Sequence, residues 1–336
     1  MIGESTVRLI NHENLSIAEA GAVIDEIMEG KAMAVETAAF LTALQAKGAT
    51  AEEIMACARS MRNHATPVKT PLPLLEIVGT GGDHAQSFNI SSTSAFVCAA
   101  GGCYVAKHGN RAATSKSGAA DVLEALGARI SLAPAACLTL LKEVGFCFLF
   151  AQTYHRAMKY VAPVRRELHT PTVFNLLGPL TNPARSAYQV LGVYEEALLE
   201  PMARALRGLD VKRGMVVFGT DGLDEISPSA VTKVCEFNGD TFQTYTIEPE
   251  RFGLKRGRKA EIIGGTPAEN ATITLSVLGG EKGTRRTAVA MNAGAGLYVS
   301  GKAATLADGI RLAGELIDSG AALERLQRFI TLSHCV

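Results

Sequence analysis

Hydrophobic positions in the first sixty residues recur at the spacing of a helix. Apolar side chains fall three and four residues apart in three stretches, 17–29, 34–47 and 50–62. The stretch 66–73 contains three prolines and cannot continue a helix. The pattern therefore predicts a small all-helical domain, residues 1–71, that ends in a linker.

From residue 74 onward the pattern changes to short apolar runs separated by longer amphipathic segments. The runs are 74–78, 103–106, 146–150, 189–193 and 215–218, and the segments with helical spacing are 93–101, 116–126, 135–144 and 195–208. Such alternation predicts a mainly parallel sheet covered by helices on both faces. Further along, 231–237 and 241–247 predict a hairpin, and 286–298, 304–318 and 320–331 predict closing helices.

The fold class expected is therefore α/β, with a small N-terminal helical domain and a large mainly parallel sheet domain flanked by helices. The large domain spans 72–336, and we expect part of 160–185 to join the helical domain in space. A chain that is 47% hydrophobic can bury a full core in two such domains.

Charge and cysteine content narrow the class of protein. The 33 basic and 33 acidic residues give a formal net charge of zero, which argues against a general attraction to nucleic acid or to an anionic membrane. The seven cysteines form no C-x-x-C pair and mostly lie in apolar stretches, as in a reduced cytosolic protein. The sequence begins with no secretion-type segment and has no apolar run long enough to span a membrane. We expect a cytoplasmic protein.

The first candidate for chemistry is the Gly-rich turn Gly79-Thr80-Gly81-Gly82-Asp83, which follows an apolar run. A dinucleotide fingerprint would need glycine at position 84 and an acid about 20 residues on, but position 84 is His and the next acid after Asp83 is Asp121. A Walker loop would need a Gly-Lys-Ser/Thr end, which this turn lacks. A simple turn with positive φ explains only one or two of the glycines.

The window 84–120 contains no Asp or Glu, although one residue in five of the whole chain is charged. It carries Lys107, Arg111 and Lys116, so the omission of acids predicts an electropositive patch. Asn89-Ile90-Ser91-Ser92-Thr93 stands where a helix is expected to begin, and there hydroxyl groups and free backbone N–H groups can bind phosphate oxygens.

Two further polar segments share this position at the end of a strand or the start of a helix. They are Lys107-His108-Gly109-Asn110-Arg111 and Thr114-Ser115-Lys116-Ser117-Gly118. Because ligands of open α/β sheets collect at the carboxyl ends of the strands, the segments together predict a ligand with several phosphates.

These motifs resemble those of anthranilate phosphoribosyltransferases. The resemblance rests on the segments above and continues through SKSGAADVLEALG at 115–127, AMKYVAPVRREL at 157–168, FNLLGPLTNPA at 174–184, GTDGLDEIS at 219–227 and EKGTRRTAVAMNAGAGLYV at 281–299. It implies transfer of a phosphoribosyl group from 5-phosphoribosyl-1-pyrophosphate to the amine of anthranilate, a step of tryptophan biosynthesis. It further implies two Mg²⁺ ions and a homodimer formed through the helical domain.

The resemblance also implies site residues, carried over position by position. The substrate-binding set is Gly79, Gly82, Asp83, Ser87, Asn89, Ile90, Ser91, Ser92, Lys107, His108, Gly109, Asn110, Arg111, Ala112, Ala113, Thr114, Ser115, Ala119 and Arg165. The metal set is Ser91, Asp224 and Glu225. For Asp83 a turn-forming role stays open, and Asp221 is expected to be an ordinary acid of a solvated loop.

The chemistry of these residue types agrees with the roles. Adjacent carboxylates such as Asp224 and Glu225 suit Mg²⁺ whose other ligands are water and phosphate. The planar guanidinium of Arg165 can pair with a benzoate-type carboxylate, while Arg166 points elsewhere on the helix. No acid or base catalyst is assigned, because an aniline nitrogen is already neutral at pH 7, and Lys107, Asp224 and Glu225 are expected to stabilise charge.

Departures from the family pattern leave alternatives open. His84 replaces Gly, Ala119 replaces Ser, Arg156 replaces Pro, and His169-Thr170-Pro171 is unusual, which puts the identity of the acceptor in doubt. The alternatives are a phosphoribosyltransferase for another aromatic amine and a non-catalytic paralogue that binds nucleic acid through 255–259 and Arg285-Arg286. A pyrimidine nucleoside phosphorylase would need a K-x-S-G-R-G motif where this chain has Lys116-Ser117-Gly118-Ala119-Ala120.

Overall fold

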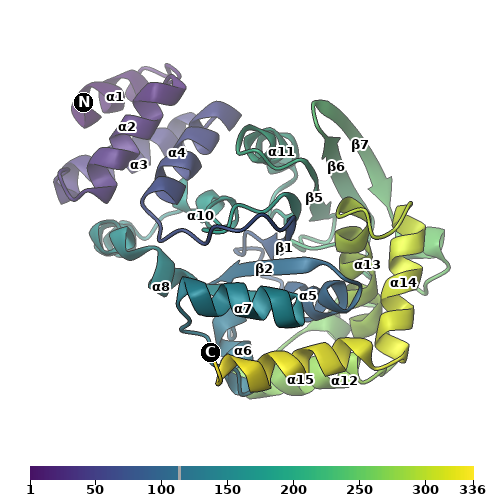
Figure 1. Ribbon diagram of the computed structural model, residues 1–336. Coiled ribbons are helices and arrows are strands. Elements are labelled where there is room, and N and C mark those ends of the chain that lie inside the picture. Colours follow the sequence, from purple (N-terminus) through teal and green to yellow (C-terminus); the bar gives the residue numbers. More distant parts are fainter. Residues whose placement is uncertain (113–114) are drawn as a thin grey trace.

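The N-terminal part of the computed structural model, which describes residues 1–112 and 115–336, is a bundle of four helices (Figure 1). These are α1 (Ile2–Ile10), α2 (Ile17–Met28), α3 (Ala34–Lys47) and α4 (Ala51–Asn63). Helices α2 and α4 begin with capping boxes, in which Ser16 pairs with Glu19 and Thr50 with Glu53. The three predicted helices are confirmed, and α1 is an addition to them.

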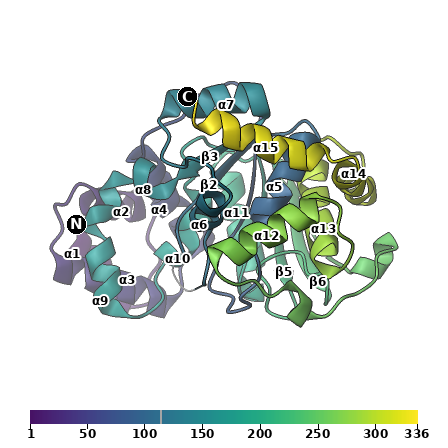
Figure 2. The same ribbon diagram turned by 90° about the horizontal axis from the view of Figure 1, so that it is seen from below.

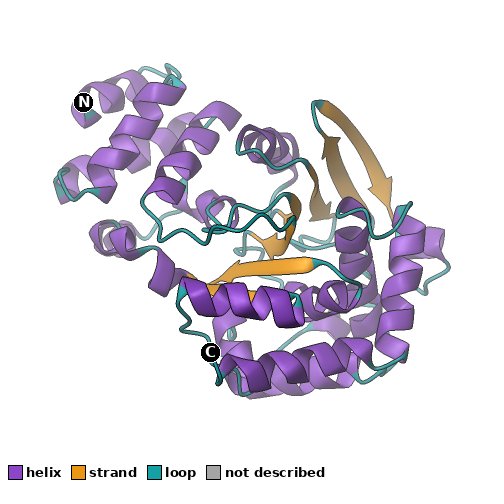
Figure 3. Cartoon of the chain, in the orientation of Figure 1, coloured by secondary structure: helices purple, strands orange, loops and turns teal. Residues whose placement is uncertain are grey.

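A seven-stranded sheet forms the centre of the larger part, with strand order β3-β2-β1-β4-β5-β6-β7 (orange in Figure 3). The strands are β1 (Leu74–Gly79), β2 (Tyr104–Gly109), β3 (Phe146–Phe150), β4 (Tyr188–Gly192), β5 (Arg213–Gly219), β6 (Thr232–Asn238) and β7 (Thr241–Ile247). Strands β1 to β5 pair in parallel, whereas β6 and β7 form the predicted antiparallel hairpin. The expected fold class is confirmed.

Helices cover both faces of this sheet (Figures 1 and 2). The helices that follow the bundle are α5 (Ile90–Ala100), α6 (Ala119–Ala125), α7 (Pro134–Val144), α8 (Ala151–Tyr154), α9 (Ala162–Leu168), α10 (Phe174–Leu177), α11 (Leu199–Gly208), α12 (Pro267–Leu278), α13 (Thr284–Val299), α14 (Leu306–Asp318) and α15 (Ala321–Ser333). Of these, α9 and α10 do not cover the sheet but pack against α3 and α4 of the bundle. Helices α5 and α13 pack on one face, and α11 packs on the other, between the sheet and α4. Helix α12 was not predicted, although its capping box, Thr266 with Glu269, is a sequence signal for it.

Alternate residues of the strands belong to two different hydrophobic clusters. Val190 and Val217 face the cluster on the α5 and α13 side, whereas Leu191 and Val216 face the cluster that includes α11 and the helical bundle. Because successive side chains of a strand point to opposite faces, strands buried on both faces read as unbroken apolar runs. The second cluster also takes in residues of 161–180, so this segment packs with the helical bundle.

Strand order creates a switch point between β1 and β4. The chain leaves β1 through α5 toward β2 on one side, and leaves β4 through α11 toward β5 on the other, so loops diverge at the carboxyl ends of this pair. Such a divergence is where open α/β sheets bind their ligands. Within residues 1–112 and 115–336, no helix combines the length and apolar character needed to cross a membrane.

Candidate active site

The Gly-rich loop after β1 has an unusual backbone. Gly81 and Gly82 have φ of 70° and 79°, and His84 and Gln86 both have φ of 53°. Left-handed backbone is natural for glycine and strained by roughly 1 kcal/mol or more for other residues, so it tends to mark functional loops. The positive φ at position 84 explains why the family pattern has glycine where this chain has His84.

The acid pair Asp224 and Glu225 lies in the loop after β5, and Asp224 contacts the Gly-rich loop. Asp224 Oδ2 accepts a hydrogen bond from Gly81 N at 2.7 Å, and Asp224 N donates to Asp83 Oδ2 at 3.4 Å. A Cβ added to Gly79 or Gly192 would overlap atoms of Asp224. The two strand ends therefore require glycine so that the acid loop can approach them.

Asp83 combines both roles considered for it from the sequence. Its Oδ1 accepts a hydrogen bond from Ala85 N at 3.1 Å, which is the Asx-turn contact, while its Oδ2 faces Asp224 N. The turn places a third carboxylate beside Asp224 and Glu225. Asp221, in contrast, accepts hydrogen bonds from the hydroxyls of Ser227 and Ser229 at 2.9 and 2.6 Å, a structural role within its own loop.

Electrostatics at the acid pair favour a bound cation. Asp224 and Glu225 are only 8% and 6% exposed. Burial, followed by repulsion from Asp83 and Glu225, holds the pKa of Asp224 well above its usual range. Burial also raises the pKa of Glu225 to about 7, against the opposing attraction of Lys107. A positive ion at this place would let both carboxylates ionise.

Lys107 is the buried cation of the site, with 1% of its surface exposed. Its Nζ donates hydrogen bonds to Ile77 O at 2.7 Å and to Ser91 Oγ at 3.1 Å. Burial lowers the pKa of Lys107, and the nearby carboxylates of Glu225, Glu76 and Asp224 oppose that shift. The lysine thus contacts the start of α5 through Ser91 and is near enough to the acid pair for their charges to interact.

Amide and hydroxyl groups surround Asn89, at the start of α5 after the Gly-rich loop. Asn89 Nδ2 donates to Ser117 O at 3.2 Å, and Asn89 Oδ1 accepts from Asn270 Nδ2 at 2.9 Å. A small hollow next to these bonds is lined by Gln86, Ser87, Ser115, Lys116, Ser117, Gly264, Gly265 and Asn270. The structure therefore brings Ser87 and Ser115 together across two loops that are distant in sequence.

The other predicted substrate-binding residues differ in exposure. Ile90 and Ser92 are buried in α5, Ala119 begins α6, Gly109 ends β2, and Asn110 is the first residue after that strand. Arg111 is exposed but ion-paired with Asp121 and Glu124, and the N–H of Ala112 also donates to Asp121. Ala113 and Thr114 lie outside the described residues.

Arg165 lies on α9, next to the helical bundle, away from the acid pair. It is half-buried, its guanidinium carbon is 5.5 Å from the ring centre of Phe174, and burial lowers its pKa. Arg166 is exposed, as the helical geometry predicted. A 3₁₀ turn, Arg156–Tyr160, precedes α9, and Val161 separates the two, with Pro163 in the first turn of α9.

Comparison with known proteins identifies the family. Residues 4–65 match the model "Glycosyl transferase family, helical bundle domain" and residues 72–323 match "Glycosyl transferase family, a/b domain". An anthranilate phosphoribosyltransferase of Methanobrevibacter smithii is 52% identical over 330 residues, which cover 98% of both chains. The chain belongs to the anthranilate phosphoribosyltransferase family.

Solved structures of family members have the same fold. The crystal structure of the Thermus thermophilus enzyme superposes with a TM-score of 0.94 at 45% identity, covering 98% of this chain and 99% of that one. The Saccharomyces cerevisiae enzyme, in complex with PRPP and Mg, superposes with a TM-score of 0.91 at 31% identity, covering 100% and 98% of the two chains.

Sequence reasoning missed Glu76, a buried polar residue near Lys107. It lies in the middle of β1 with no exposed surface, and its Oε1 accepts the backbone N–H of His108 at 3.0 Å. Burial raises its pKa to about 7, although hydrogen bonds and the cations Lys107 and Arg62 favour its charged form. The available signal was one acid inside an otherwise apolar strand.

Two histidines near Glu76 are held neutral. His108 and His155 have ring centres 5.0 Å apart, and burial lowers their pKa values to about 3 and about 4. His108 Nδ1 is 3.2 Å from Gly178 O, so it donates there as the neutral tautomer. These neutral rings lie between β2 and the segment 178–181, where His108 contacts Gly178 and His155 contacts Thr181.

We expect Glu76→Gln to gain stability relative to the wild type as pH rises. In the wild type the folded pKa of Glu76, about 7, exceeds the unfolded value near 4.5, so folding takes up a proton between these pH values and stability falls across them. The stability difference between variant and wild type should grow by about 2–3 kcal/mol from pH 5 to pH 8. Urea unfolding at each pH measures the stability of both proteins. His108 and His155 titrate in the opposite direction in both, so their effect cancels when the two stabilities are subtracted. A stability difference that does not change with pH would contradict the expectation.

The basic segments considered for nucleic-acid binding are largely engaged within the protein. Arg256 forms ion pairs with Glu248 and Glu250, and Arg258 pairs with Glu261. Arg285 Nε donates to Glu261 O at 3.1 Å. Arginines that are paired within the protein are less available to a phosphate backbone, which disfavours the nucleic-acid alternative.

Proposed function

We propose that this chain transfers the phosphoribosyl group of 5-phosphoribosyl-1-pyrophosphate to the amine of anthranilate, as part of tryptophan biosynthesis. The observation that carries the proposal is the buried acid pair Asp224 and Glu225 set against a Gly-rich loop at the switch point of the sheet. Such a pair is stable as carboxylates only with added positive charge, and a divalent ion that also binds a diphosphate supplies that charge.

The donor would lie along the Gly-rich loop and the start of α5. Gly79, Gly82 and Asp83 would border the ribose and diphosphate, and the substrate-binding residues of 87–92, 107–115 and 119 would surround the phosphates. Lys107 uses two of its N–H groups on Ile77 and Ser91, which leaves the third for a ligand oxygen. A buried ammonium in this position stabilises the negative charge that develops on the leaving group.

Magnesium fits the residues present, and we propose two ions held by Ser91, Asp224 and Glu225. Within the described residues, no three His, Cys, Asp or Glu side chains are grouped closely enough to hold a metal alone. Mg²⁺ commonly binds through one or two carboxylates together with water and substrate phosphate, so an incomplete protein set is the expected one. When bound, the ions would neutralise charge on the diphosphate.

The acceptor would bind between α9 and the end of β2. Arg165 offers two parallel donors to the anthranilate carboxylate, and Phe174 beneath its guanidinium holds the side chain in place. Asn110 and neutral His108 would border the ring. His169-Thr170-Pro171 ends α9 and is exposed, with His169 at φ 49°, so another aromatic amine as acceptor stays the second candidate.

The reaction needs positioning more than proton transfer. The lone pair of the aromatic amine forms the new N–C1 bond, and the electrons of the C1–O bond leave with pyrophosphate. The amine nitrogen then loses one proton to solvent or to the released pyrophosphate. Holding the two reactants in line and stabilising the leaving charge account for most of the catalysis expected here.

Arg165→Ala should raise the KM for anthranilate about 10- to 100-fold, because it removes a charge-assisted pair of hydrogen bonds. The decay of anthranilate fluorescence with Mg²⁺ and phosphoribosyl pyrophosphate measures the rate. Arg166→Ala is the matched control and should behave like the wild type, since Arg166 is exposed.

Three outcomes separate the parts of this proposal. No decay in the wild type, with the donor still bound, would reject anthranilate and favour another aromatic amine. No decay and no donor binding would reject the transferase function. Equal KM values for the Arg165 and Arg166 variants would reject Arg165 as the carboxylate clamp.

We further propose a domain boundary at 71/72, with part of 160–185 belonging to the helical domain, and a homodimer formed through that domain. Val7 and Ile10 on α1 and Met33 and Val35 at the start of α3 are exposed apolar side chains that a second copy would cover. Val7→Asp with Ile10→Asp should halve the mass measured by light scattering; a dimer unaffected by them would reject this face.

Seven unpaired cysteines support a cytoplasmic location.

A further inference from the structure

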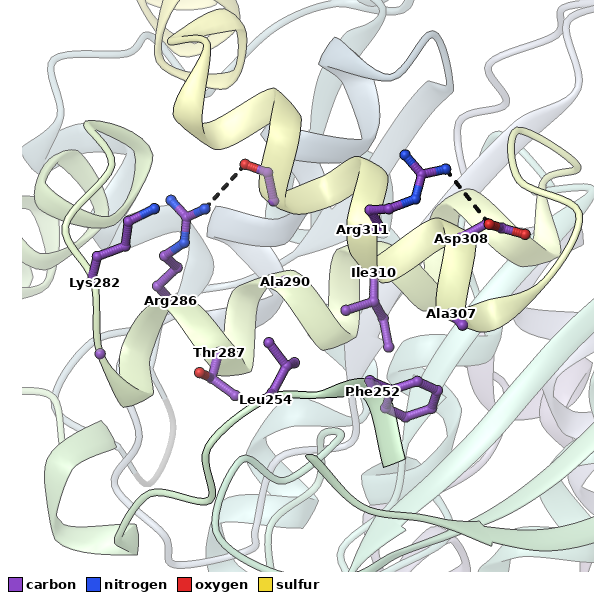
Figure 4. Close-up of a pocket in the computed structure, with 12 residues that line it drawn as sticks. Phe252, Leu254, Lys282, Arg286, Thr287, Ala290, Ala307, Asp308, Ile310 and Arg311 are labelled. Atoms are coloured by element: carbon purple, nitrogen blue, oxygen red, sulfur yellow. Dashed lines mark hydrogen bonds and ion pairs between the residues drawn. The ribbon is translucent and has the colours of Figure 1, made fainter. Parts of the chain in front are cut away.

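A second hollow, of about 550 Å³, lies between α13, α14 and the loop after β7 (Figure 4). Its lining residues are Phe252, Leu254, Lys282, Gly283, Arg286, Thr287, Ala290, Ala307, Asp308, Ile310, Arg311 and Gly314. It shares no residue with the candidate active site, and its volume is within the usual range for sites that bind small molecules.

The hollow has an apolar wall and a cationic end. Phe252, Leu254 and Ile310 line its middle, while Lys282 and Arg286 extend next to each other at one end (Figure 4). At the other end, Arg311 pairs with Asp308 at 3.6 Å and with Glu315 at 2.7 Å, so its charge is balanced.

The Lys282 and Arg286 end carries excess positive charge. Both cations share the single carboxylate of Asp318, each at 2.7 Å. Arg286 Nη2 also donates to Gly314 O at 3.1 Å, whereas Nη1 is buried and has no hydrogen-bond acceptor among the described residues. Helix α13 begins at Thr284, beside this end, and adds the partial positive charge of its N-terminus. An added anion would therefore be stabilised here.

Gly314 keeps the hollow open at a cost to the helix. Gly294 and Gly309 lie where α13 and α14 cross, and an added Cβ at either would overlap the facing helix. At Gly314 an added Cβ would meet only Arg286 Nη2, at 3.7 Å, and its φ is not left-handed. Neither packing nor backbone conformation therefore requires glycine at 314, although glycine within a helix is less stable than alanine.

We propose that this hollow is a binding site for a small organic anion with an aromatic or aliphatic body. The acidic group lies at Lys282 and Arg286, and the body packs on Phe252, Leu254 and Ile310. The site is separate from the proposed reaction, and its occupancy does not depend on which acceptor the enzyme uses.

The test uses 1-anilinonaphthalene-8-sulfonate as probe and N-phenyl-1-naphthylamine as its uncharged counterpart, both followed by fluorescence. Gly314→Phe fills the hollow and should raise the Kd of the sulfonate at least tenfold. Gly21→Phe is the matched control, because it adds the same side chain to a helix glycine with no atom within 4 Å and should leave the Kd unchanged.

The charged end is tested by Lys282→Glu, a surface change that leaves the core intact. It should raise the Kd of the sulfonate at least threefold at low salt, with a smaller effect at high salt, and leave the uncharged probe unaffected. Saturating phosphoribosyl pyrophosphate with Mg²⁺ should displace neither probe. Equal Kd values for the Gly314 and Gly21 variants, displacement by the donor, or no effect of Lys282→Glu would each overturn the proposal.

Discussion

Asp224→Asn should lower kcat/KM by about 100- to 1000-fold, roughly 3–4 kcal/mol of transition-state stabilisation. The amide keeps the oxygen that accepts from Gly81 N and fits the space left by Gly79 and Gly192. What it removes is the negative charge that draws a divalent ion to the leaving diphosphate. The same change relieves repulsion of buried Asp224 by Glu225 and by the partly buried Asp83, so the variant should be at least as stable as the wild type without ligands.

Asp221→Asn is the matched control for this prediction. It lies in the same loop, but its carboxylate accepts from Ser227 and Ser229 and has no expected part in the reaction. We expect near-normal activity and a stability loss of about 1 kcal/mol. Steady-state rates over a range of Mg²⁺ concentrations measure the activity of both variants, and urea unfolding measures their stability. Full activity in Asp224→Asn would contradict the role given to the acid pair.

Much of the fold could be predicted because local patterns dominate it. Strands β1 to β5 are buried on both faces, so each is an apolar run between polar turns, and the hairpin is marked by Asn238-Gly239-Asp240. The sheet order could not be read in the same way. It depends on contacts between distant segments, such as β1 with β4, for which the sequence carries no local mark.

The candidate site shows where local reasoning ends. The window 84–120 has no acid along the chain, yet Lys107 within it is surrounded in space by Glu76, Asp224 and Glu225 from outside the window. Arg111 is likewise paired with Asp121 and Glu124, just beyond its end. Asp224 and Glu225 could be predicted because they lie in a motif of the family, whereas Glu76 lies in no such motif.

Lys107→Met should be the most damaging change to stability. It replaces a buried ammonium by an apolar group of similar length and leaves Glu76, Asp224 and Glu225 without their cation. Removing one partner from a buried charged group costs about 3–5 kcal/mol. Urea unfolding at pH 8 should show this loss, and a smaller one at pH 6, where carboxyls with pKa values near 7 take up protons and shed their charge.

A second substitution separates stability from function. Glu225→Gln in the Lys107→Met background removes one of the uncompensated charges and should recover part of the stability, a coupling that a double-mutant cycle measures. Activity should stay lost, because neither the ammonium nor the full acid pair remains to stabilise the diphosphate. If Lys107→Met unfolds like the wild type at both pH values and turns over normally, Lys107 is neither the counter-ion of the buried carboxylates nor a stabiliser of the leaving group.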